Sequence, residues 1–510
     1  MIYMSREVGL CLAFRDMWQS SCGFFPSVSQ LREIASAIVK IGCFDRVETN
    51  GGAFEQLCLL NGENPNAAVR EFVHPLKEAG IKPLMLERGL NALRLNPVSS
   101  DIRELMFKIK KAQGIEIARS FCGLNDHRNL RYSVESAKLV GMISQVALPI
   151  VNSPVHTLEH YLAVVDKVVE YGCDEICLKD MSGQGVPSFM ADLIFLIKQH
   201  YPSLFIQYHR HCGPDSRDSL LAVVRAGADA VDVALRPLSG GASHSDLLEV
   251  VDWLRADGFF VKDVDVSAYE YAVSLLGTYL SDTHSKHCLV DSSFSSLLME
   301  CGLPGGMMAS LADDISVYHN AVNAALNSRE LSGLTFGQFL CRFVEEVKSI
   351  WPLLGYPPMV TPFSQYVASA ALSNLLAMSQ EQLRWSSLNS DIWNMILGRM
   401  GMLPGPVCSE LIELAKTRGL EFYSGEPHEL YPDSLEYYRS MMEREGWSVG
   451  CNDEELLMFS MFEGLYRSYI ATSAGLGLAK KPELESELED DAVYAAIAMA
   501  LYEYQWLAEL

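Results

Sequence analysis

The sequence predicts an α/β protein: a (β/α)8 (TIM) barrel followed by a C-terminal helical domain. Two observations support this prediction. Over the first 260 residues, eight short apolar segments alternate with segments of helical spacing, and several apolar segments end in a charged residue or a histidine. After about residue 262 the pattern becomes helical. A doubly wound open sheet is the alternative, but the first predicted strand lacks the glycine-rich phosphate turn typical of that fold.

Several of the predicted strands are largely apolar over four to six residues, as expected for parallel strands covered on both faces. They comprise residues 8–16, 46–50, 81–88, 115–121, 143–151, 175–180, 204–211 and 230–236. Two of the intervening helical stripes are Leu31, Ile34, Ile38 and Ile41, and Leu162, Val165, Val168 and Val169. Ser27 or Ser29 is available to cap the first of these helices.

We expect three parts in the chain. Residues 1–262 form the barrel with the candidate site, and residues 263–473 form a helical domain that completes it. Residues 474–510 form an acidic linker and a C-terminal helix. Glycine and proline breaks divide the second part at residues 302–306, 355–358 and 404–406.

The charge and cysteine content of the chain indicate which partners and which compartment to expect. The 510 residues carry a formal net charge of −24, which argues against nucleic acid and anionic membrane surfaces as partners. The 13 cysteines are scattered, which favours free thiols in a reducing compartment. No apolar run approaches the roughly 18 residues of a membrane span, and the N-terminus does not resemble a signal peptide. We expect a cytoplasmic location.

Several predicted strands end in residues suited to a metal site, which barrels place at the carboxyl ends of their strands. His209 and His211 lie two apart on one strand, so their imidazoles share a face. Asp16 ends the first strand and can reach the same cavity. A carboxylate with imidazoles suits zinc, manganese or cobalt. The alternative is a pair of half-buried strand histidines.

Lys179 joins such a site only if its amine is carbamylated, because an ammonium would repel the ion. The alternative is a strand-end lysine that reaches water, and spacing alone favours it. The complete set of polar residues at the predicted strand ends is Asp16, Glu48, Arg88, Arg119, Lys179, His209, His211 and Arg236.

Two further features suggest substrate binding. Arg88 could hold a substrate carboxylate through two parallel hydrogen bonds, or form a salt bridge within the rim. Thr361 and Ser364 flank a proline-stiffened turn, where an ordinary helix N-cap is the interpretation that local sequence favours.

Taken together, ten segments in order resemble the carboxyltransferase of biotin-dependent enzymes: pyruvate carboxylase, the oxaloacetate decarboxylase α subunit and transcarboxylase. The matching segments begin at Phe14, Gly51, Leu86, Arg119, Ser153, Leu178, His209, Leu289, Pro304 and Val360. Among them are Phe-Arg-Asp-x-x-Gln-Ser, Leu-Lys-Asp-Met, His-x-His and Val-Thr-Pro-x-Ser-Gln. The set spans residues 14 to about 465 and is specific as an ordered set.

The resemblance implies a metal centre. Asp16, His209, His211 and a carbamylated Lys179 would hold a divalent cation: zinc, manganese or cobalt. The ion would draw electron density from a bound keto acid, so that its methyl carbon can lose a proton.

It also implies the reaction: carboxyl transfer between oxaloacetate or pyruvate and biotin, through a pyruvate enolate. Gln19 and Arg88 would bind the keto acid. Thr361 would shuttle a proton between the pyruvate methyl group and the biotin ring nitrogen, and Ser364 would lie near the biotin ureido group. The direction of the reaction is not set by the sequence.

No Ala-Met-Lys-Met biotin-attachment sequence and no ATP-grasp segment occurs, so we expect biotin to arrive on a separate carrier protein. The resemblance further implies a homodimer, and other decarboxylase or transcarboxylase subunits as candidate partners. The tail from Glu489 weakly resembles a helix of sodium-pumping decarboxylase subunits, which would place the protein peripherally on a membrane complex. An ordinary C-terminal helix is the alternative.

The chain departs from the family pattern around the site. Trp18, Leu90, Leu95, Cys122 and Cys212 replace polar family residues. Leu90, Leu95 and Cys122 leave open a scaffold subunit that has lost turnover. A second alternative is an acyl-CoA lyase or synthase of the same barrel group, which also uses Arg-Asp and His-x-His.

Overall fold

The computed structural model describes residues 6–21, 25–183, 185–213, 215–282, 301–304, 307–447 and 452–473. The predicted linker and helix at 474–510 lie outside this range, as do the segment at Leu289 and Gly305-Gly306. Among the described helices, none is both long and apolar enough to cross a membrane.

The predicted (β/α)8 barrel is confirmed. Eight parallel strands close into a barrel in chain order, with β1 paired to both β2 and β8. The strands are β1 (Gly9–Leu12), β2 (Arg46–Asn50), β3 (Lys82–Glu87), β4 (Ile117–Phe121), β5 (Ile143–Pro149), β6 (Glu175–Asp180), β7 (Phe205–Arg210) and β8 (Ala230–Val233). Each lies within its predicted range, with ends that differ by a few residues.

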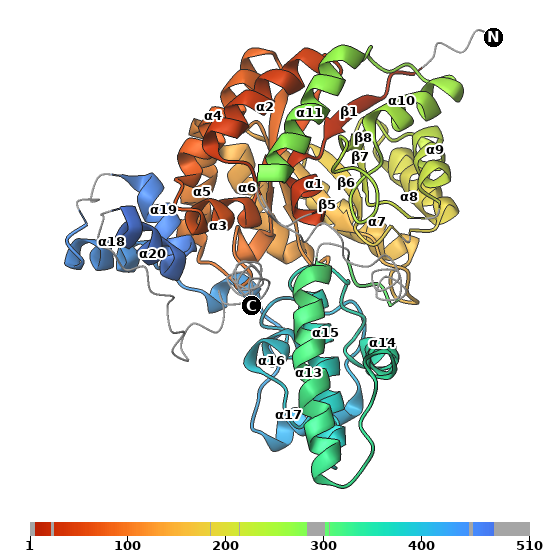
Figure 1. The fold of residues 1–510 in the computed structure, drawn as a ribbon, viewed down its shortest axis with the longest axis vertical. Helices are drawn as coiled ribbons and strands as arrows, with labels where there is room; N and C mark the ends of the chain where they lie inside the picture. The colour runs from red at the N-terminus through yellow and green to blue at the C-terminus, as the bar shows by residue number, and fades with distance from the viewer. Residues whose placement is uncertain are drawn as a thin grey trace.

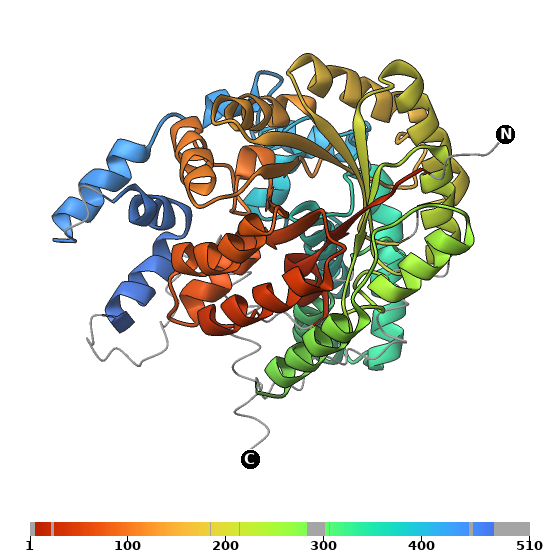
Figure 2. The ribbon, with the colours of Figure 1, turned by 90° about the horizontal axis from the view of Figure 1, so that it is seen from above.

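Helices surround the barrel and bury their apolar stripes against it (Figures 1 and 2). They are α1 (Phe14–Ser21), α2 (Val28–Ile41), α3 (Gly52–Leu60), α4 (Pro65–Glu78), α5 (Ser100–Ala112), α6 (His127–Leu139), α7 (Leu158–Glu170), α8 (Pro187–His200), α9 (Ser216–Ala226) and α10 (Leu247–Ala256). As predicted, Ser27 caps α2, where it forms a capping box with Gln30. The buried face of α7 differs slightly from the predicted stripe. Tyr161 and Val164 are buried, whereas Leu162 of the predicted stripe is only partly buried.

The remaining helices occupy three places. Helix α11 (Val266–Asp282) packs against α2 of the barrel. A group projects from one end of the barrel (Figure 1): α13 (Met308–Ser328), α14 (Phe336–Leu353), α15 (Phe363–Ser379), α16 (Ser390–Ile396) and α17 (Ser409–Thr417). A third group lies beside α3 and α5: α18 (Leu435–Arg444), α19 (Asp453–Met461) and α20 (Glu463–Ser473). The domain boundaries at 262 and 473 stay predictions.

The barrel interior is charged, although branched apolar side chains usually dominate such interiors. Near the amino ends of the strands, Arg46 forms two hydrogen bonds to Glu175 across the barrel, at 2.5 and 3.0 Å. In the next layer Arg119 of β4 contacts Glu48 of β2 at 3.0 Å and Asp232 of β8 at 2.8 Å. These pairs tie together strands that are not neighbours in the sheet.

Glu87 is a buried carboxyl group that takes no part in these salt bridges. Glu87 ends β3 and is fully buried, and neither of its carboxyl oxygens has a hydrogen-bond partner among the described residues. Burial raises the pKa of Glu87 to about 7, and the nearby Ser120 and Ser133 hydroxyls offset this only in part.

Glu87→Gln should therefore change how stability depends on pH. The folded protein holds a proton on Glu87 that the unfolded chain releases at lower pH, so this contribution is present in acid and is lost as the pH rises through about 7. Between pH 5 and pH 8 we expect wild type to lose about 2 kcal/mol through this group. The free energy of unfolding is measured in urea at both pH values. At pH 8 the variant should be more stable than wild type.

Glu104→Gln, at an exposed position of α5, is the matched control and should leave the pH dependence unchanged. Equal stability of wild type and Glu87→Gln at pH 8 would show that the buried carboxyl group does not carry the expected penalty.

Candidate metal centre and active site

Four predicted ligands meet at one end of the barrel. The closest approach joins His211 Nε2 to Asp16 Oδ1 at 3.2 Å, and His209 Nε2 lies 3.6 Å from Asp16 Oδ2. Lys179 Nζ lies 4.0 Å from the same Asp16 oxygen. All four side chains are buried.

The strands explain three of these positions. Lys179 and His209 are register partners on the neighbouring strands β6 and β7. His211 follows directly after β7 and shares the face of His209. The prediction that Asp16 ends a strand is wrong: β1 stops at Leu12, and Asp16 lies in the first turn of α1.

Both imidazoles are oriented by a partner on the far side of the ring. His209 Nδ1 lies 2.6 Å from Asp232 Oδ2, and His211 Nδ1 lies 2.6 Å from the carbonyl oxygen of Ala242. If each Nδ1 carries the proton, each Nε2 presents its lone pair toward Asp16. Metal-binding histidines are typically fixed in this way.

The protonation states suit a cation. Burial, then the charges of Lys179 and His244, lower the pKa of His209 well below its ordinary value and keep the imidazole neutral. Burial alone would raise the pKa of Asp16, but Arg15 and His211 outweigh it and hold the pKa well below the usual range. A carboxylate and imidazole nitrogens are donors that divalent transition metals prefer, so these residues fit such an ion.

Sequence reasoning missed a third histidine. His244, in the loop after β8, is fully buried and its Nε2 lies 3.2 Å from His209 Nε2. Asp16, His209, His211 and His244 each offer one ligand atom within 4.8 Å of the others. The available signal was topological, because the loop after β8 lies at the same end of the barrel as the other loops.

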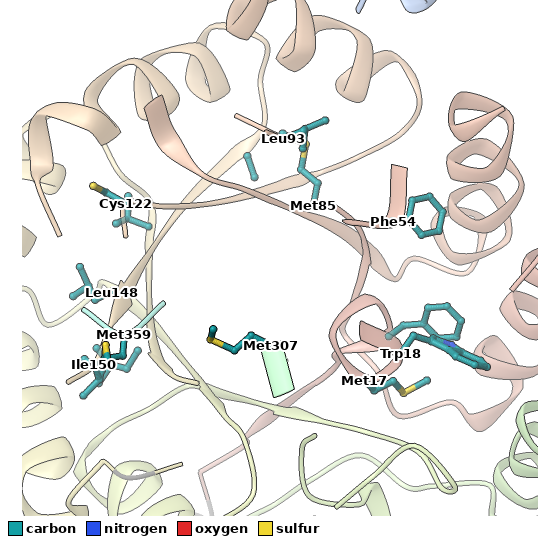
Figure 3. Packing of buried hydrophobic residues seen from close by; sticks show 14 of the residues in the cluster. Met17, Trp18, Phe54, Met85, Leu93, Cys122, Leu148, Ile150, Met307 and Met359 are labelled. Carbon is teal, nitrogen blue, oxygen red and sulfur yellow. The ribbon is translucent and has the colours of Figure 1, made fainter. Parts of the chain in front are cut away.

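An open pocket of about 490 Å³, a volume that includes solvent at its mouth, lies beside this cluster. Its wall includes Asp16, Gln19, Arg88, Lys179, Met181, His211, Pro304, Met307 and Thr361. Met307 points into the ring of strands (Figure 3). The region after the barrel therefore contributes to the cavity wall.

Backbone contacts hold Arg88 at the cavity. Its Nη1 donates to the carbonyl oxygens of Leu93 and Arg94 at 3.0 and 2.9 Å. A Cβ at Gly52 would overlap the Leu93 carbonyl and lie 2.6 Å from Arg88 Nη1. Gly52 is thus required for the turn after β2 to pack on the loop that holds Arg88. Gln19 accepts a hydrogen bond from Arg15.

A second, smaller cavity adjoins the first. Its wall includes Arg88, Leu90, Asn91, Phe121, Cys122, Gly123, Asn129, Thr361, Pro362, Phe363 and Met400. Arg88, Phe121 and Thr361 line both cavities. Two of the departures from the family pattern, Leu90 and Cys122, lie in this second wall, whereas Trp18 and Leu95 are buried and line neither of the two cavities.

The other residues predicted for the site line neither of the two cavities. Ser364 is fully buried and lines neither of these two cavities, and its Oγ has no hydrogen-bond partner in the described part of the chain. The expectation of a side-chain cap at this turn is wrong, because α15 begins after Pro362 with no side-chain cap. Arg236 turns away from the site, toward Tyr269 and Glu270 of α11. Glu48 and Arg119 lie inside the barrel, below the rim.

The fold and the cluster define a (β/α)8 barrel protein whose strand ends carry a buried, metal-competent donor set beside a cavity. A family model described as the conserved carboxylase domain matches residues 330–500. The chain is 27% identical over 454 residues to a pyruvate carboxylase subunit of Methanocaldococcus jannaschii, covering 88% of this chain and 75% of the relative. It is also 27% identical over 468 residues to the methylmalonyl-CoA carboxyltransferase 5S subunit of Propionibacterium freudenreichii subsp. shermanii, covering 90% and 86%.

A solved structure of the carboxyl transferase domain from Rhizobium etli pyruvate carboxylase has a TM-score of 0.76 at 20% identity, over 93% of this chain and 79% of that chain. This likeness confirms the fold. The sequence matches confirm the resemblance of the chain to the carboxyltransferase of biotin-dependent enzymes.

Arg119→Met should destabilise the protein strongly. The substitution leaves Glu48 and Asp232 buried without this cation, and breaking such a buried pair costs about 3–5 kcal/mol. Urea unfolding at pH 7 measures the loss, with the exposed Arg131→Met of α6 as a control that should stay within about 0.5 kcal/mol. A decrease of less than about 1 kcal/mol in the free energy of unfolding would mean that the barrel tolerates the unpaired carboxylates by admitting water.

Proposed function

We propose that this protein transfers a carboxyl group between oxaloacetate or pyruvate and biotin carried on a separate protein. The observation that supports this most directly is the pair of adjoining cavities that share Arg88, Phe121 and Thr361. One cavity reaches Asp16 and Lys179 of the candidate metal centre, as a keto-acid site requires. The other has a largely uncharged wall, which suits the biotin ring.

In this proposal Asp16, His209, His211 and a carbamylated Lys179 hold zinc, manganese or cobalt. When bound, the ion supplies Lewis acidity that makes the keto-acid methyl group easier to deprotonate. Carbamylation joins the neutral amine to carbon dioxide and releases a proton. Burial lowers the pKa of Lys179, against the opposing charges of Asp16 and Glu48, so a larger share of the amine is neutral and nucleophilic.

Charge balance supports the carbamate. The ion pairs described inside the barrel and around Asp16 join four cations to four carboxylates: Arg15, Arg46, Arg119, Lys179, Asp16, Glu48, Glu175 and Asp232. Converting the Lys179 ammonium to a carbamate removes two units of positive charge, and a divalent cation restores them. The site thus accepts the ion without a buried net charge, which would be costly.

Arg88 and Gln19 are assigned to the substrate. A guanidinium fork matches a carboxylate bidentately, and Arg88 presents its group at the cavity from a backbone-anchored position. Gln19 lines the same wall and offers an amide to the keto-acid carbonyl.

Thr361 is assigned to proton transfer. The pyruvate methyl carbon loses a proton and gains the carboxyl group, while the biotin ring nitrogen loses the carboxyl group and gains the proton. A hydroxyl that borders both cavities can accept one proton as it donates the other. Ser364 beside the biotin ureido group stays a prediction from the family pattern.

Partners follow from the relatives. Two of them are named as subunits, one of pyruvate carboxylase and one of methylmalonyl-CoA carboxyltransferase. We propose that this chain likewise works with a biotin carrier protein and other subunits in the cytoplasm, as a homodimer.

Thr361→Ala should abolish carboxyl transfer, whereas Thr361→Ser should retain most of it. Loss of a positioned acid–base group costs about 10²–10⁴-fold in rate, and serine keeps the hydroxyl. The measurement is oxaloacetate decarboxylation by metal-loaded protein, stimulated by free biotin or a biotinylated carrier. Equal rates for the alanine variant and wild type would remove Thr361 from the reaction, and no biotin-stimulated activity in wild type would overturn the proposed function.

Metal-loaded protein in ¹³C-bicarbonate should show a carbamate carbonyl resonance by NMR that disappears in Lys179→Arg. Lys110→Arg is the matched control, because Lys110 is also fully buried but pairs with Glu55. An active wild-type protein without the resonance would rule out the carbamate.

A further inference from the structure

We propose that His244 is an additional ligand of the metal, supplied by the loop after β8 from the side of the cluster that faces away from the cavity. This inference rests on the proposed function only in assuming that the site holds a divalent metal. Its consequence is that the ion is retained, more weakly, when Lys179 is not carbamylated.

His244 lies among the candidate ligands. The side chain is fully buried, and its Nδ1 has no hydrogen-bond partner within the described ranges, so its ring, unlike those of His209 and His211, is positioned by its loop alone. Its ring centroid lies 4.4 Å from that of His209 and 4.7 Å from that of His211. Three imidazoles therefore lie around the Asp16 carboxylate at the mouth of the barrel.

The donor atoms are close enough together to bind one ion. Ligand atoms bound at about 2.0–2.1 Å to a tetrahedral ion lie about 3.3 Å from one another. His244 Nε2 lies 3.2 Å from His209 Nε2 and 3.3 Å from His209 Nδ1, so the two rings are in contact. Asp16 Oδ1 lies 3.2 Å from His211 Nε2, and Asp16 Oδ2 lies 3.6 Å from His209 Nε2. All pairs of ligand atoms in this set fall within 4.8 Å.

The loop that carries His244 is fixed by the same residues that place His211. The Ala242 carbonyl oxygen lies 2.6 Å from His211 Nδ1, and Cys212 donates its backbone N–H to the Ser243 carbonyl oxygen at 2.7 Å. Within the loop, Gly240 donates its backbone N–H to the His244 carbonyl oxygen at 2.8 Å. These bonds hold His244 on the cluster without help from an ion.

His244 lies on the side of the cluster that faces away from the cavity. Asp16, Lys179 and His211 line the cavity, whereas His209 and His244 lie behind them and are absent from its wall. A bond from His244 would leave the cavity side of the ion free for substrate and for the Lys179 carbamate.

The experiment titrates metal-free protein with Co²⁺ in carbon dioxide-free buffer, following binding by equilibrium dialysis and visible absorption. We expect wild type and Lys179→Met to bind Co²⁺, and His244→Gln to bind more than about tenfold more weakly with an altered spectrum. Bicarbonate should restore much of the affinity in His244→Gln, but not in the double variant. His127→Gln, at a half-buried histidine that contacts Tyr171, is the control and should behave as wild type.

Wild-type affinity and an unchanged spectrum in His244→Gln would overturn the inference and leave His244 as a hydrogen-bond donor to His209. X-ray absorption of Co²⁺-loaded wild type needs no variant and gives a second measurement: three imidazole ligands support the inference, and two refute it. Protein that binds Co²⁺ through His244 but transfers no carboxyl group would refute the proposed function alone. Failure of wild type to bind Co²⁺ would refute both the metal centre and this inference.

Discussion

The salt-bridge network inside the barrel is the constraint on which the candidate site depends. Arg119 connects Glu48 to Asp232, and Asp232 fixes His209. At the other end of the network, Arg15 connects Glu48 to Asp16, with 2.7 Å between Arg15 Nη2 and Asp16 Oδ2. The two outermost members are therefore candidate metal ligands. In a water-poor interior each charge is tolerable only beside its partner, so the pairing that closes the barrel also orients these ligands.

A small apolar cluster separates part of this network from the cavity. It comprises Leu86, Phe121, Ala147, Cys177 and Val360, with Met181 packed against it. Phe121 lies two residues beyond Arg119 on the same strand face, and Lys179 Nζ lies 5.4 Å from the centre of its ring. Because apolar walls lower the local dielectric constant, charges at the cavity act on a bound substrate more strongly than they would in water.

The sequence was sufficient to predict the barrel because short strand-like segments alternate regularly with segments of helical spacing, and several of the strands have an apolar centre, such as Ile176, Cys177 and Leu178 in β6. It failed for Asp16, because the apolar run from Leu10 continues without a break into Phe14 and hides the start of α1. It failed for His244 because a loop has no periodicity from which a side-chain direction could be inferred. The placement of both residues depends on contacts made across the barrel end, which local sequence does not encode.

The departures from the family pattern that line a cavity all lie in the second cavity. Leu90 and Cys122 both lie in the wall of the second cavity, and neither lines the first. Burial raises the pKa of the Cys122 thiol to about 11, so the thiol is neutral at physiological pH. The first cavity keeps Asp16 and Arg88, the charged groups that a keto acid and a cation need. If the second cavity receives the biotin ring, its loss of polar residues alters how an uncharged ring is held, while the charged chemistry of the first cavity is preserved. This distribution favours a working enzyme with a changed carrier site over a scaffold, because a scaffold would have no reason to keep a buried, metal-competent donor set that is costly to maintain.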